Sequence, residues 1–271
     1  MKLSVILPTY NEAANIVELI NAIIEHIPEP WEPEIIVADD NSPDGTLHAV
    51  QQAFPSDPRI VTILRTKDRG LARSIRDGLL LATGEQVLVM DTDFTHDPVE
   101  IPRLLHVAQI YDVVTGSRFC AGGNMEDTSH YLASLCYNWC MRLILRTQIQ
   151  DNLGGYFTIR REALEVLPYD EIFYGYGDYY FRLLHFAEKQ GYTLVELPAQ
   201  YLTRRKGASK SNFFRLLLSY TTAVVKFRFR VARKLRAQPR RVPKPIQMSD
   251  RAAVFARDTE TSVATKSSEQ S

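Results

Sequence analysis

The first 115 residues alternate between short, mostly apolar runs and longer segments with helical spacing. The apolar runs occupy residues 3–7, 34–38, 60–64, 87–90 and 112–115. Such runs are typical of strands that are buried on both faces of a parallel sheet. Between them, apolar side chains recur every three or four positions over residues 13–27, 44–54, 71–82 and 99–110, which predicts helices. The alternation predicts an α/β fold, with an open, mostly parallel sheet and helices on both faces.

The second half of the chain has longer helical patterns and fewer strands. Residues 131–145, 178–190 and 213–235 have helical spacing, and residues 154–160 and 193–197 have the character of strands. Residues 207–211 form a polar loop in this interpretation. A length of 271 residues suits one large domain or two small ones. We expect one domain over residues 1–211, an amphipathic helix within 212–237 and a disordered tail over 238–271.

In open parallel sheets, ligands bind outside the carboxyl ends of the strands. This rule directs attention to residues 8–12, 39–44, 91–96 and 116–118, which follow predicted strands. The strongest local pattern there is Asp91-Thr92-Asp93, two carboxylates one residue apart at the end of a buried strand. Mg²⁺ or Mn²⁺ is commonly held by one or two carboxylates together with substrate phosphates. The alternative is a solvated loop with two acids.

Three further acids and a tyrosine stand at predicted strand ends. Asp39 is placed to accept hydrogen bonds from a base or ribose, as acids at this position do in other nucleotide-binding folds. Tyr10 can stack on a base, and Glu12 can accept hydrogen bonds from the base or stabilise the beginning of the next helix. Asp44 lies in turn-forming sequence and is better interpreted as a helix N-cap than as a ligand contact.

Basic residues could neutralise a departing diphosphate. Arg118 follows a predicted strand, and a Gly-containing loop carries Arg204, Arg205, Lys206 and Lys210; a solvated basic loop is the alternative. The first strand is not followed by Gly-x-Gly-x-x-Gly, and the chain has neither a Walker loop nor a nucleophile elbow. These absences argue against a dinucleotide dehydrogenase, a P-loop NTPase and a Ser-His-Asp hydrolase.

Charge and cysteine usage bear on compartment and partners. The formal net charge is zero, but residues 226–244 carry basic residues and no acid, which suggests an anionic surface. The apolar and basic side chains of residues 213–235 suit a helix at a membrane interface, with packing against the domain as the alternative. Nucleic acid is not an expected partner. The three cysteines form no disulfide framework, and Cys136 and Cys140 are expected to be buried free thiols. Neither a signal peptide nor a transmembrane helix is expected, which favours the cytosol.

These motifs together resemble family 2 glycosyltransferases of the GT-A fold, and more narrowly the dolichyl- and polyprenyl-phosphate mannose synthases. The resemblance spans roughly residues 2–211. The matching stretches are residues 8–12, 39–46, 70–75, 91–98, 116–118 and 204–210. The chain departs from the family pattern at Thr95, at residues 151–157 and at residues 175–179.

The resemblance implies a role for each matching residue. The nucleotide of a sugar-nucleotide donor would be held by Pro8, Tyr10, Glu12, Val37 and Asp39. Asp91 and Asp93 would bind both the donor and Mg²⁺ or Mn²⁺, and Thr92 would also contact the donor. Arg118, Arg204 and Lys210 would bind phosphates, and Arg118 would act together with Asp93 and Asp178 in catalysis.

The expected reaction is an inverting transfer of mannose from GDP-mannose to a polyprenyl phosphate, by an enzyme bound peripherally to the cytosolic face of a membrane. A phosphate acceptor is already anionic and needs no strong base, whereas a hydroxyl acceptor would need one, for which Asp151 or Asp178 is the candidate. Asp178 also fits a helix cap. The alternatives are a UDP-sugar-dependent polyprenyl-phosphate glucosyltransferase, a hydroxyl-acceptor transferase, and an inactive sugar-nucleotide-binding protein.

Overall fold

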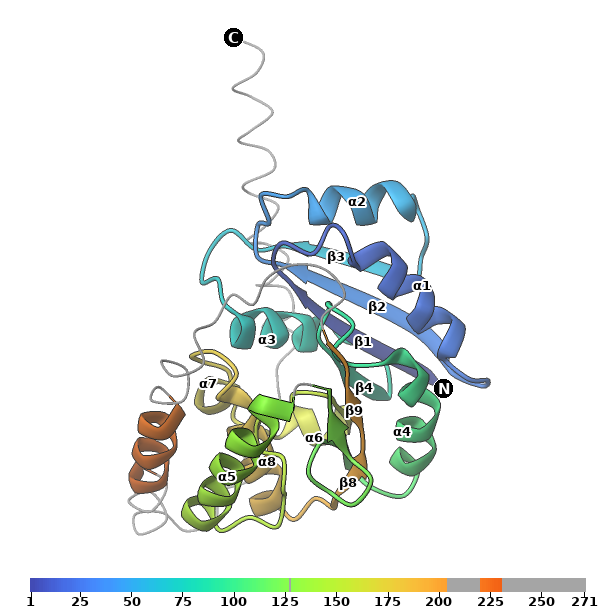
Figure 1. Ribbon diagram of the computed structural model, residues 1–271. Helices are drawn as coiled ribbons and strands as arrows, with labels where there is room; N and C mark the ends of the chain where they lie inside the picture. Colours follow the sequence, from blue (N-terminus) through green and yellow to red (C-terminus); the bar gives the residue numbers. More distant parts are fainter. Residues whose placement is uncertain (127, 204–219, 231–271) are drawn as a thin grey trace.

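The computed structural model of the chain describes residues 1–126, 128–203 and 220–230. Its centre is a seven-stranded sheet with helices packed on both faces (Figure 1). The strands across the sheet are β3 (Ile60–Leu64), β2 (Glu32–Asp39), β1 (Lys2–Thr9), β4 (Gln86–Val89), β7 (Phe157–Arg160), β5 (Val113–Ser117) and β8 (Leu194–Pro198).

The sheet is parallel except at one strand. β7 runs antiparallel to β4 on one side and to β5 on the other, whereas the other neighbouring pairs are parallel. The predicted α/β fold with a mostly parallel sheet is therefore confirmed. A separate two-stranded sheet pairs β6 (Asn124–Met125) with β9 (Gln200–Tyr201), two strands that the sequence pattern does not predict.

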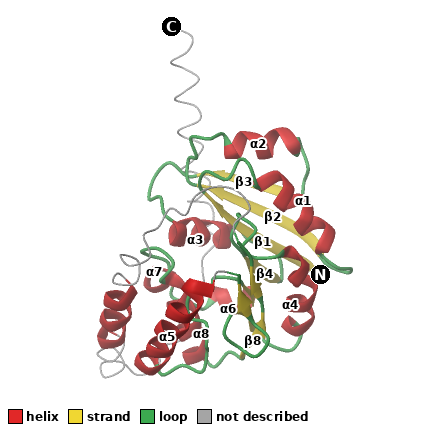
Figure 2. Cartoon of the chain, in the orientation of Figure 1, coloured by secondary structure: helices red, strands yellow, loops and turns green. Residues whose placement is uncertain are grey.

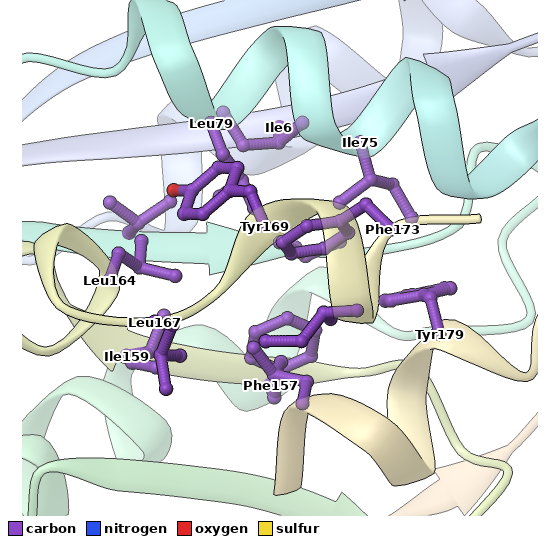
Figure 3. Packing of buried hydrophobic residues seen from close by; sticks show 14 of the residues in the cluster. Ile6, Ile75, Leu79, Phe157, Ile159, Leu164, Leu167, Tyr169, Phe173 and Tyr179 are labelled. Atoms are coloured by element: carbon purple, nitrogen blue, oxygen red, sulfur yellow. The ribbon is translucent and has the colours of Figure 1, made fainter. Parts of the chain in front are cut away.

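Each face of the large sheet carries its own hydrophobic core, as the layered arrangement in Figure 2 indicates. One core includes side chains of α1 (Ile16–His26), α2 (Thr46–Ala53) and α4 (Ile101–Ala108). The opposite core includes side chains of α3 (Leu71–Leu81), α6 (Arg161–Glu165), α7 (Tyr169–Ile172) and α8 (Tyr179–Gln190). Figure 3 shows part of the second core, in which Ile75 and Leu79 of α3 lie near Ile6 of β1 and the aromatic rings of Tyr169 and Phe173.

The sequence explains why these helices form and where they end. In α1 the buried residues Ile16, Leu19, Ile20 and Ile23 follow the spacing of one helix face. α8 ends at Gly191, whose φ of +89° suits glycine and whose N–H donates to the last carbonyls of the helix. Local spacing therefore determines which side of each helix faces the sheet.

A third hydrophobic cluster joins α5 (Thr128–Leu145), α8 and the helical residues 220–230, which are the orange-red helix in Figure 1. Phe227 packs against Phe181 and Phe186 of α8, with ring centroids 5.6 and 5.8 Å apart. Val224 and Phe227 are buried with Met141 of α5 in the same cluster. One face of this helix therefore packs on the domain, which was the alternative to an interfacial position.

Some sequence expectations need correction or lie beyond the described residues. Cys136 and Cys140 are exposed free thiols rather than buried ones, because they lie on the outer face of α5. In the described part of the chain, no helix is both long enough and apolar enough to span a membrane. The expected loop at 207–211, the flanks 212–219 and 231–237 of the amphipathic helix, and the tail 238–271 fall outside the described residues.

Candidate active site

The carboxyl ends of the parallel strands lie along one edge of the sheet. At this edge Thr9 at the end of β1 pairs with Asp39 at the end of β2. Because β7 is antiparallel, its first residue, Phe157, lies at the same edge, opposite Val89 of β4 and Thr115 of β5. Residues 151–156 therefore arrive beside the ends of β4 and β5, which the parallel-sheet rule does not predict.

Asp39 is buried and firmly oriented at the end of β2. Its Oδ1 accepts a hydrogen bond from the Ser42 N–H at 2.8 Å. Its Oδ2 accepts hydrogen bonds from the hydroxyls of Ser42 at 2.5 Å and Thr9 at 3.1 Å. A ligand at this edge would meet a carboxylate whose direction is already set by its neighbours on β1 and in its own turn.

Asp40, the next residue, belongs to a buried ionic network under the site. It is ion-paired with Arg65, which also donates to Asp77 at 2.8 Å and to the Ser74 hydroxyl at 3.0 Å. The second carboxylate oxygen of Asp40 accepts the Gly70 N–H at 2.6 Å. The network ties the end of β2 to the beginning of α3. Sequence reasoning assigned no role to Asp40, because its partners lie far away along the chain.

Pro8 and Tyr10 follow the first strand, as predicted, but differ in exposure. Pro8 is buried, and its carbonyl accepts a long hydrogen bond from the Thr92 hydroxyl at 3.4 Å. Tyr10 is 40% exposed, and the Arg69 guanidinium lies 5.1 Å from the centre of its ring. The partly exposed ring lies at the edge of the sheet, where aromatic rings can stack on planar groups.

Glu12 is buried where the chain turns into α1. Its carbonyl accepts the N–H groups of Asn15 and Ile16, both at 2.9 Å, and its carboxylate accepts the Asn15 amide at 2.8 Å. Its own N–H donates to the Thr46 hydroxyl at 2.9 Å. These contacts give Glu12 a structural task at the beginning of the helix.

Asp44 also makes structural contacts. Its carboxylate accepts hydrogen bonds from the N–H groups of Ala13 and Thr46, both at 3.0 Å, and from the Thr46 hydroxyl at 2.5 Å. Burial would raise the pKa of Asp44, but the hydrogen bonds from Thr46 and Ala13 outweigh burial and lower it. The cap position of α2 itself is Gly45, with φ +81°. Asp44 thus stabilises the same turn from one residue earlier than a true N-cap.

The Asp91–Asp93 turn follows β4 and presents its two carboxylates differently. The side chain of Asp91 is 47% exposed, whereas Asp93 is buried. Oδ1 of Asp93 accepts the N–H of Thr95 at 3.0 Å and the Thr95 hydroxyl at 2.6 Å. Phe94, whose φ is +65°, is buried in the core and anchors the turn.

The carboxylate oxygens of this turn are suitable ligands for a divalent cation. The described residues contain no cluster of three or more His, Cys, Asp or Glu side chains that could hold a metal by themselves. Two carboxylates combined with donor phosphates and water are, however, an ordinary ligand set for Mg²⁺ or Mn²⁺. Asp91 and Asp93 are therefore the residues that would hold such an ion.

Arg118, just after β5, is paired with Asp151, just before β7. Nε and Nη2 of Arg118 donate to the two carboxylate oxygens at 2.8 and 2.7 Å, and the backbone N–H of Arg118 adds a third bond at 3.1 Å. Asp151 is fully buried. Burial would lower the pKa of Arg118, but the carboxylate of Asp151 raises it above its ordinary value. Much of the hydrogen-bonding capacity of Arg118 is thus directed at Asp151 rather than at a phosphate.

Asp178 lies just before α8 and is paired with Arg182, one helical turn later. Its Oδ2 accepts a hydrogen bond from Arg182 at 2.5 Å, and its Oδ1 accepts the Tyr176 N–H at 2.7 Å. Arg182 is fully buried, donates to the carbonyls of Ile172 and Tyr174, and stacks over the Tyr174 ring at 3.7 Å. Asp178 stands at the N-cap position of α8, but its side chain makes no capping hydrogen bond and instead shapes the turn that leads into the helix.

His96 is a residue of the site to which sequence reasoning gave no role. Its ring is buried between Tyr156, stacked at a centroid distance of 4.8 Å, and the edge of Tyr201, also at 4.8 Å. Burial lowers the pKa of His96 to about 4, although the nearby Asp93 acts in the opposite direction. The ring is therefore neutral near pH 7. Its position in a strand-end loop is the one sequence feature that points to it.

Of the remaining predicted site residues, one has a buried side chain and two are not described by the structure. Val37 is in β2, two residues before Asp39, and its side chain is fully buried in the core beside α1, so its predicted contact with the nucleotide stays a prediction. Both of its neighbours in the sheet, Leu7 and Thr62, are paired with it. Arg204 and Lys210 lie outside the described residues, so their predicted contacts with phosphate stay predictions.

Sequence comparison relates the chain to known proteins. The profile of the family described as Glycosyl transferase family 2 matches residues 4–167. A dolichol-phosphate mannosyltransferase of Pyrococcus furiosus is 33% identical over 216 residues, which are 78% of this chain and 59% of that protein. The chain thus spans about three fifths of the length of that relative. An undecaprenyl-phosphate mannosyltransferase of Micrococcus luteus is 33% identical over 219 residues, 78% of this chain and 87% of the other.

Solved structures agree on the fold. Glucosyl-3-phosphoglycerate synthase of Mycobacterium tuberculosis, in complex with Mn²⁺, UDP and phosphoglyceric acid, superposes with a TM-score of 0.62 at 19% identity. The match covers 83% of this chain and 76% of the synthase. The profile and the relatives confirm the resemblance that the motifs indicate, and the chain belongs to glycosyl transferase family 2, a family of enzymes that transfer sugars.

Proposed function

We propose that this enzyme transfers mannose from GDP-mannose to a polyprenyl phosphate, with Mg²⁺ or Mn²⁺ at Asp91 and Asp93. The observation that carries the proposal is the Asp91–Asp93 turn at the carboxyl edge of the sheet, in a chain whose relatives in P. furiosus and M. luteus are named mannosyltransferases of dolichol and undecaprenyl phosphate. The synthase of the same fold binds Mn²⁺ and UDP, and it has also been solved with Mg²⁺ and UDP, which supports a divalent ion.

The donor would lie along the sheet edge. Asp39 and Tyr10 would hold the nucleotide, with Pro8 and Glu12 shaping the same wall. A divalent ion supplies positive charge that stabilises the departing diphosphate. Arg118, Arg204 and Lys210 are the proposed basic contacts to the phosphates.

The transfer would invert the configuration of the sugar. An acceptor phosphate oxygen forms a bond to the anomeric carbon while the bond from that carbon to the diphosphate oxygen breaks, and GDP leaves with the electron pair. Such an acceptor is anionic near neutral pH and needs no base. Both acids that could serve a hydroxyl acceptor are already ion-paired, Asp151 with Arg118 and Asp178 with Arg182. This pairing favours a phosphate acceptor.

An apolar outer surface on α5 supports a lipid acceptor. Leu132, Trp139 and Leu143 are each at least 60% exposed and, with the exposed Cys136, follow the spacing of one helix face. On the neighbouring helix 220–230, Phe229 is 73% exposed. Large apolar side chains gathered on an outer face are typical of a surface that contacts a membrane or a partner.

Basic side chains accompany this apolar face. Arg146 follows α5 and is exposed, and Lys226 and Arg230 are exposed on helix 220–230. Cationic side chains around an apolar face favour an anionic lipid surface. We therefore propose that the enzyme is a peripheral protein at the cytosolic face of a membrane, with both helices in contact with lipid.

The test is a donor panel. Purified full-length protein is incubated with Mn²⁺ or Mg²⁺, a short polyprenyl phosphate, and GDP-mannose, UDP-glucose or UDP-galactose. GDP-mannose should be used at least tenfold faster than the UDP-sugars. Asp93→Asn should lose about 100-fold or more in rate, the scale typical for removal of one electrostatic contact to a transition state. Asp97→Asn is the matched control. Asp97 lies four residues after Asp93 in the same segment, and this variant should keep its activity.

Other results would replace the proposal. Faster use of UDP-glucose would identify a glucosyltransferase, and transfer to a sugar hydroxyl but not to the lipid phosphate would identify a hydroxyl-acceptor enzyme. Donor binding without turnover in any metal would identify an inactive sugar-nucleotide-binding protein. Full activity of Asp93→Asn would remove the central role of the Asp91–Asp93 turn.

A further inference from the structure

His96 lies directly behind the Asp91–Asp93 turn and contacts the main chain of Asp91. Its Nδ1 accepts the hydrogen bond of the Asp91 N–H at 2.9 Å. Its Nε2 lies 3.8 Å from Oδ2 of the same residue. The imidazole therefore lies alongside Asp91, touching its backbone on one side and approaching its carboxylate on the other.

Two tyrosine rings fix the imidazole in place. Tyr156 stacks on it almost in parallel, at an interplanar angle of 9°, and the Tyr156 hydroxyl donates to the carbonyl of Asp97 at 3.1 Å. Tyr201 meets the ring edge-on, at 79°. A ring confined on two sides cannot turn without displacing residues of the core, so the direction of its Nδ1 is fixed.

The same contacts join the turn to β9. His96 forms an isolated β-bridge with Tyr201, and the Leu202 N–H donates to the Thr95 carbonyl at 3.1 Å. The Tyr201 ring in turn lies 4.9 Å from the guanidinium of Arg118. One continuous set of contacts therefore links the Asp91–Asp93 turn to Arg118, and to the chain that continues from β9 toward residue 204.

We propose that His96 is a positioning residue, which acts as a hydrogen-bond acceptor to set the main chain of Asp91 so that its exposed carboxylate is ready for a divalent cation. Asp91 has the more exposed of the two carboxylates, since 47% of its side chain is accessible while Asp93 is buried and bonded to Thr95. Fixing its backbone reduces the conformational entropy that would be lost on binding the ion. The inference rests on the metal site of the proposed function and adds to it the residue that orients one ligand.

The test measures Mn²⁺ binding directly. Free Mn²⁺ is followed by electron paramagnetic resonance during titration of the full-length protein, with and without GDP. His96→Phe keeps an aromatic ring without an acceptor, and His96→Gln moves the acceptor away from the position of Nδ1. Both should raise the Kd for Mn²⁺ about tenfold or more, the usual scale for losing a residue that orients a metal ligand.

A variant that restores a hydrogen-bond acceptor at the position of Nδ1 distinguishes a positioning role of His96 from a role in packing alone. His96→Asn places a carbonyl oxygen near the position of Nδ1, so its Kd for Mn²⁺ should stay within about threefold of wild type, well inside the loss expected for the other variants. His185→Gln, at a second buried histidine distant in sequence from this turn, is the matched control and should bind Mn²⁺ as wild type does. At saturating Mn²⁺, the turnover rate of the His96→Phe variant should change much less than its Kd for Mn²⁺ does.

Each contrary result is informative. Wild-type Mn²⁺ affinity in folded His96→Phe and His96→Gln overturns the inference, and so does an Asn variant as weak as the Phe variant. If the His96 variants fail to fold, Tyr201→Leu removes the edge contact instead and should weaken Mn²⁺ binding; unchanged affinity there also overturns the inference. Unchanged Mn²⁺ affinity in Asp93→Asn would instead remove the metal site itself, which is a failure of the proposed function.

Discussion

The charged residues behind the site are arranged as buried pairs rather than as isolated groups. Arg118 and Asp151 form one pair and Arg182 and Asp178 another, and all four residues are nearly or fully buried. A carboxylate that is bonded to a guanidinium on one side is held in place. At this scale we interpret the two pairs as groups that orient charge, and not as general bases.

Asp178 provides a test of that view. Asp178→Asn should keep the transfer rate within about tenfold of wild type, because a phosphate acceptor needs no base, whereas loss of a required general base usually costs 100-fold or more. Initial rates are measured with polyprenyl phosphate well below the melting temperature of the variant. A rate reduced by three orders of magnitude would favour a hydroxyl acceptor activated by Asp178.

The Arg118–Asp151 pair should matter for stability. Arg118→Met leaves the fully buried Asp151 without its cation, which should cost about 3–5 kcal/mol in the free energy of unfolding. The double variant Arg118→Met, Asp151→Leu should recover much of that loss, because no uncompensated charge is left. Urea denaturation of the three proteins measures both changes. If the double variant is no more stable than Arg118→Met, the unpaired carboxylate of Asp151 is not the cause of the lost stability.

At the scale of elements, close backbone contacts determine how helices pack on the sheet. Gly78 of α3 lies against Ile6 of β1, and a Cβ at position 78 would lie 2.6 Å from Cγ2 of Ile6. α3 can approach the sheet this closely only because position 78 has no side chain. The core shown in Figure 3 depends on that approach.

Gly78→Ala should therefore destabilise the protein. In an exposed helix this change stabilises by up to about 1 kcal/mol, but here the added methyl group should cost about 1–3 kcal/mol through overpacking. The midpoint of urea unfolding gives the sign of the effect. A stabilised variant would mean that α3 lies further from β1 than the structure has it.

Helix 220–230 should respond to acid through His185 of α8. The His185 ring is buried 5.2 Å from the Phe227 ring, and burial, with smaller effects of Lys189 and Arg228, lowers its pKa from 6.5 to about 4. Above pH 6.5 the ring is neutral in both the folded and the unfolded chain. Between about 6.5 and 4 the unfolded chain binds the extra proton, so stability from His185 is present above 6.5 and is lost as the pH falls toward 4.

The measurement is the melting temperature as a function of pH. Wild type should lose stability between pH 6.5 and 4 more steeply than His185→Gln, and the two curves should run parallel above pH 7. Parallel curves at all pH values would mean that His185 titrates alike in the folded and unfolded chains. The comparison isolates His185 because all other titrating groups are common to both proteins.

The sequence predicts elements and strand-end residues well, but not their long-range partners. The strand at residues 60–64 has the predicted bounds, and most of the predicted helices are present to within a few residues. Asp39, Asp91 and Asp93 lie at strand ends, as their local patterns indicate. The antiparallel direction of β7 and the His96–Tyr201 contact join residues distant in sequence, so no local pattern encodes them.

At the scale of the whole molecule, α5 and helix 220–230 lie side by side, as Figure 1 and their shared hydrophobic cluster indicate. Each buries one face in that cluster and exposes large apolar side chains elsewhere, notably Trp139 and Phe229. If these surfaces contact lipid, the membrane lies against a pair of packed helices and not against a single detached one.

Trp139 reports on this contact without a label. The chain has two tryptophans, so Trp31→Phe leaves Trp139 as the only one. Its emission should shift to shorter wavelength on addition of vesicles that contain anionic lipid, and the shift should weaken with salt. Trp139→Ser should reduce vesicle binding. Emission that stays unchanged with lipid would contradict contact through α5.

The position of β7 in the sheet has a consequence for synthesis of the chain. β7 separates β4 from β5, yet it is made later than either strand. A nascent chain that ends before Phe157 has the strands β3, β2, β1 and β4 with an unpaired edge at β4, and β5 lacks both of its neighbours because β8 is also made later. Unpaired strand edges are prone to pair with other chains. The protein is most exposed to aggregation while residues 118–156 are being made, and fragments truncated in that interval should need a chaperone that the full-length chain does not.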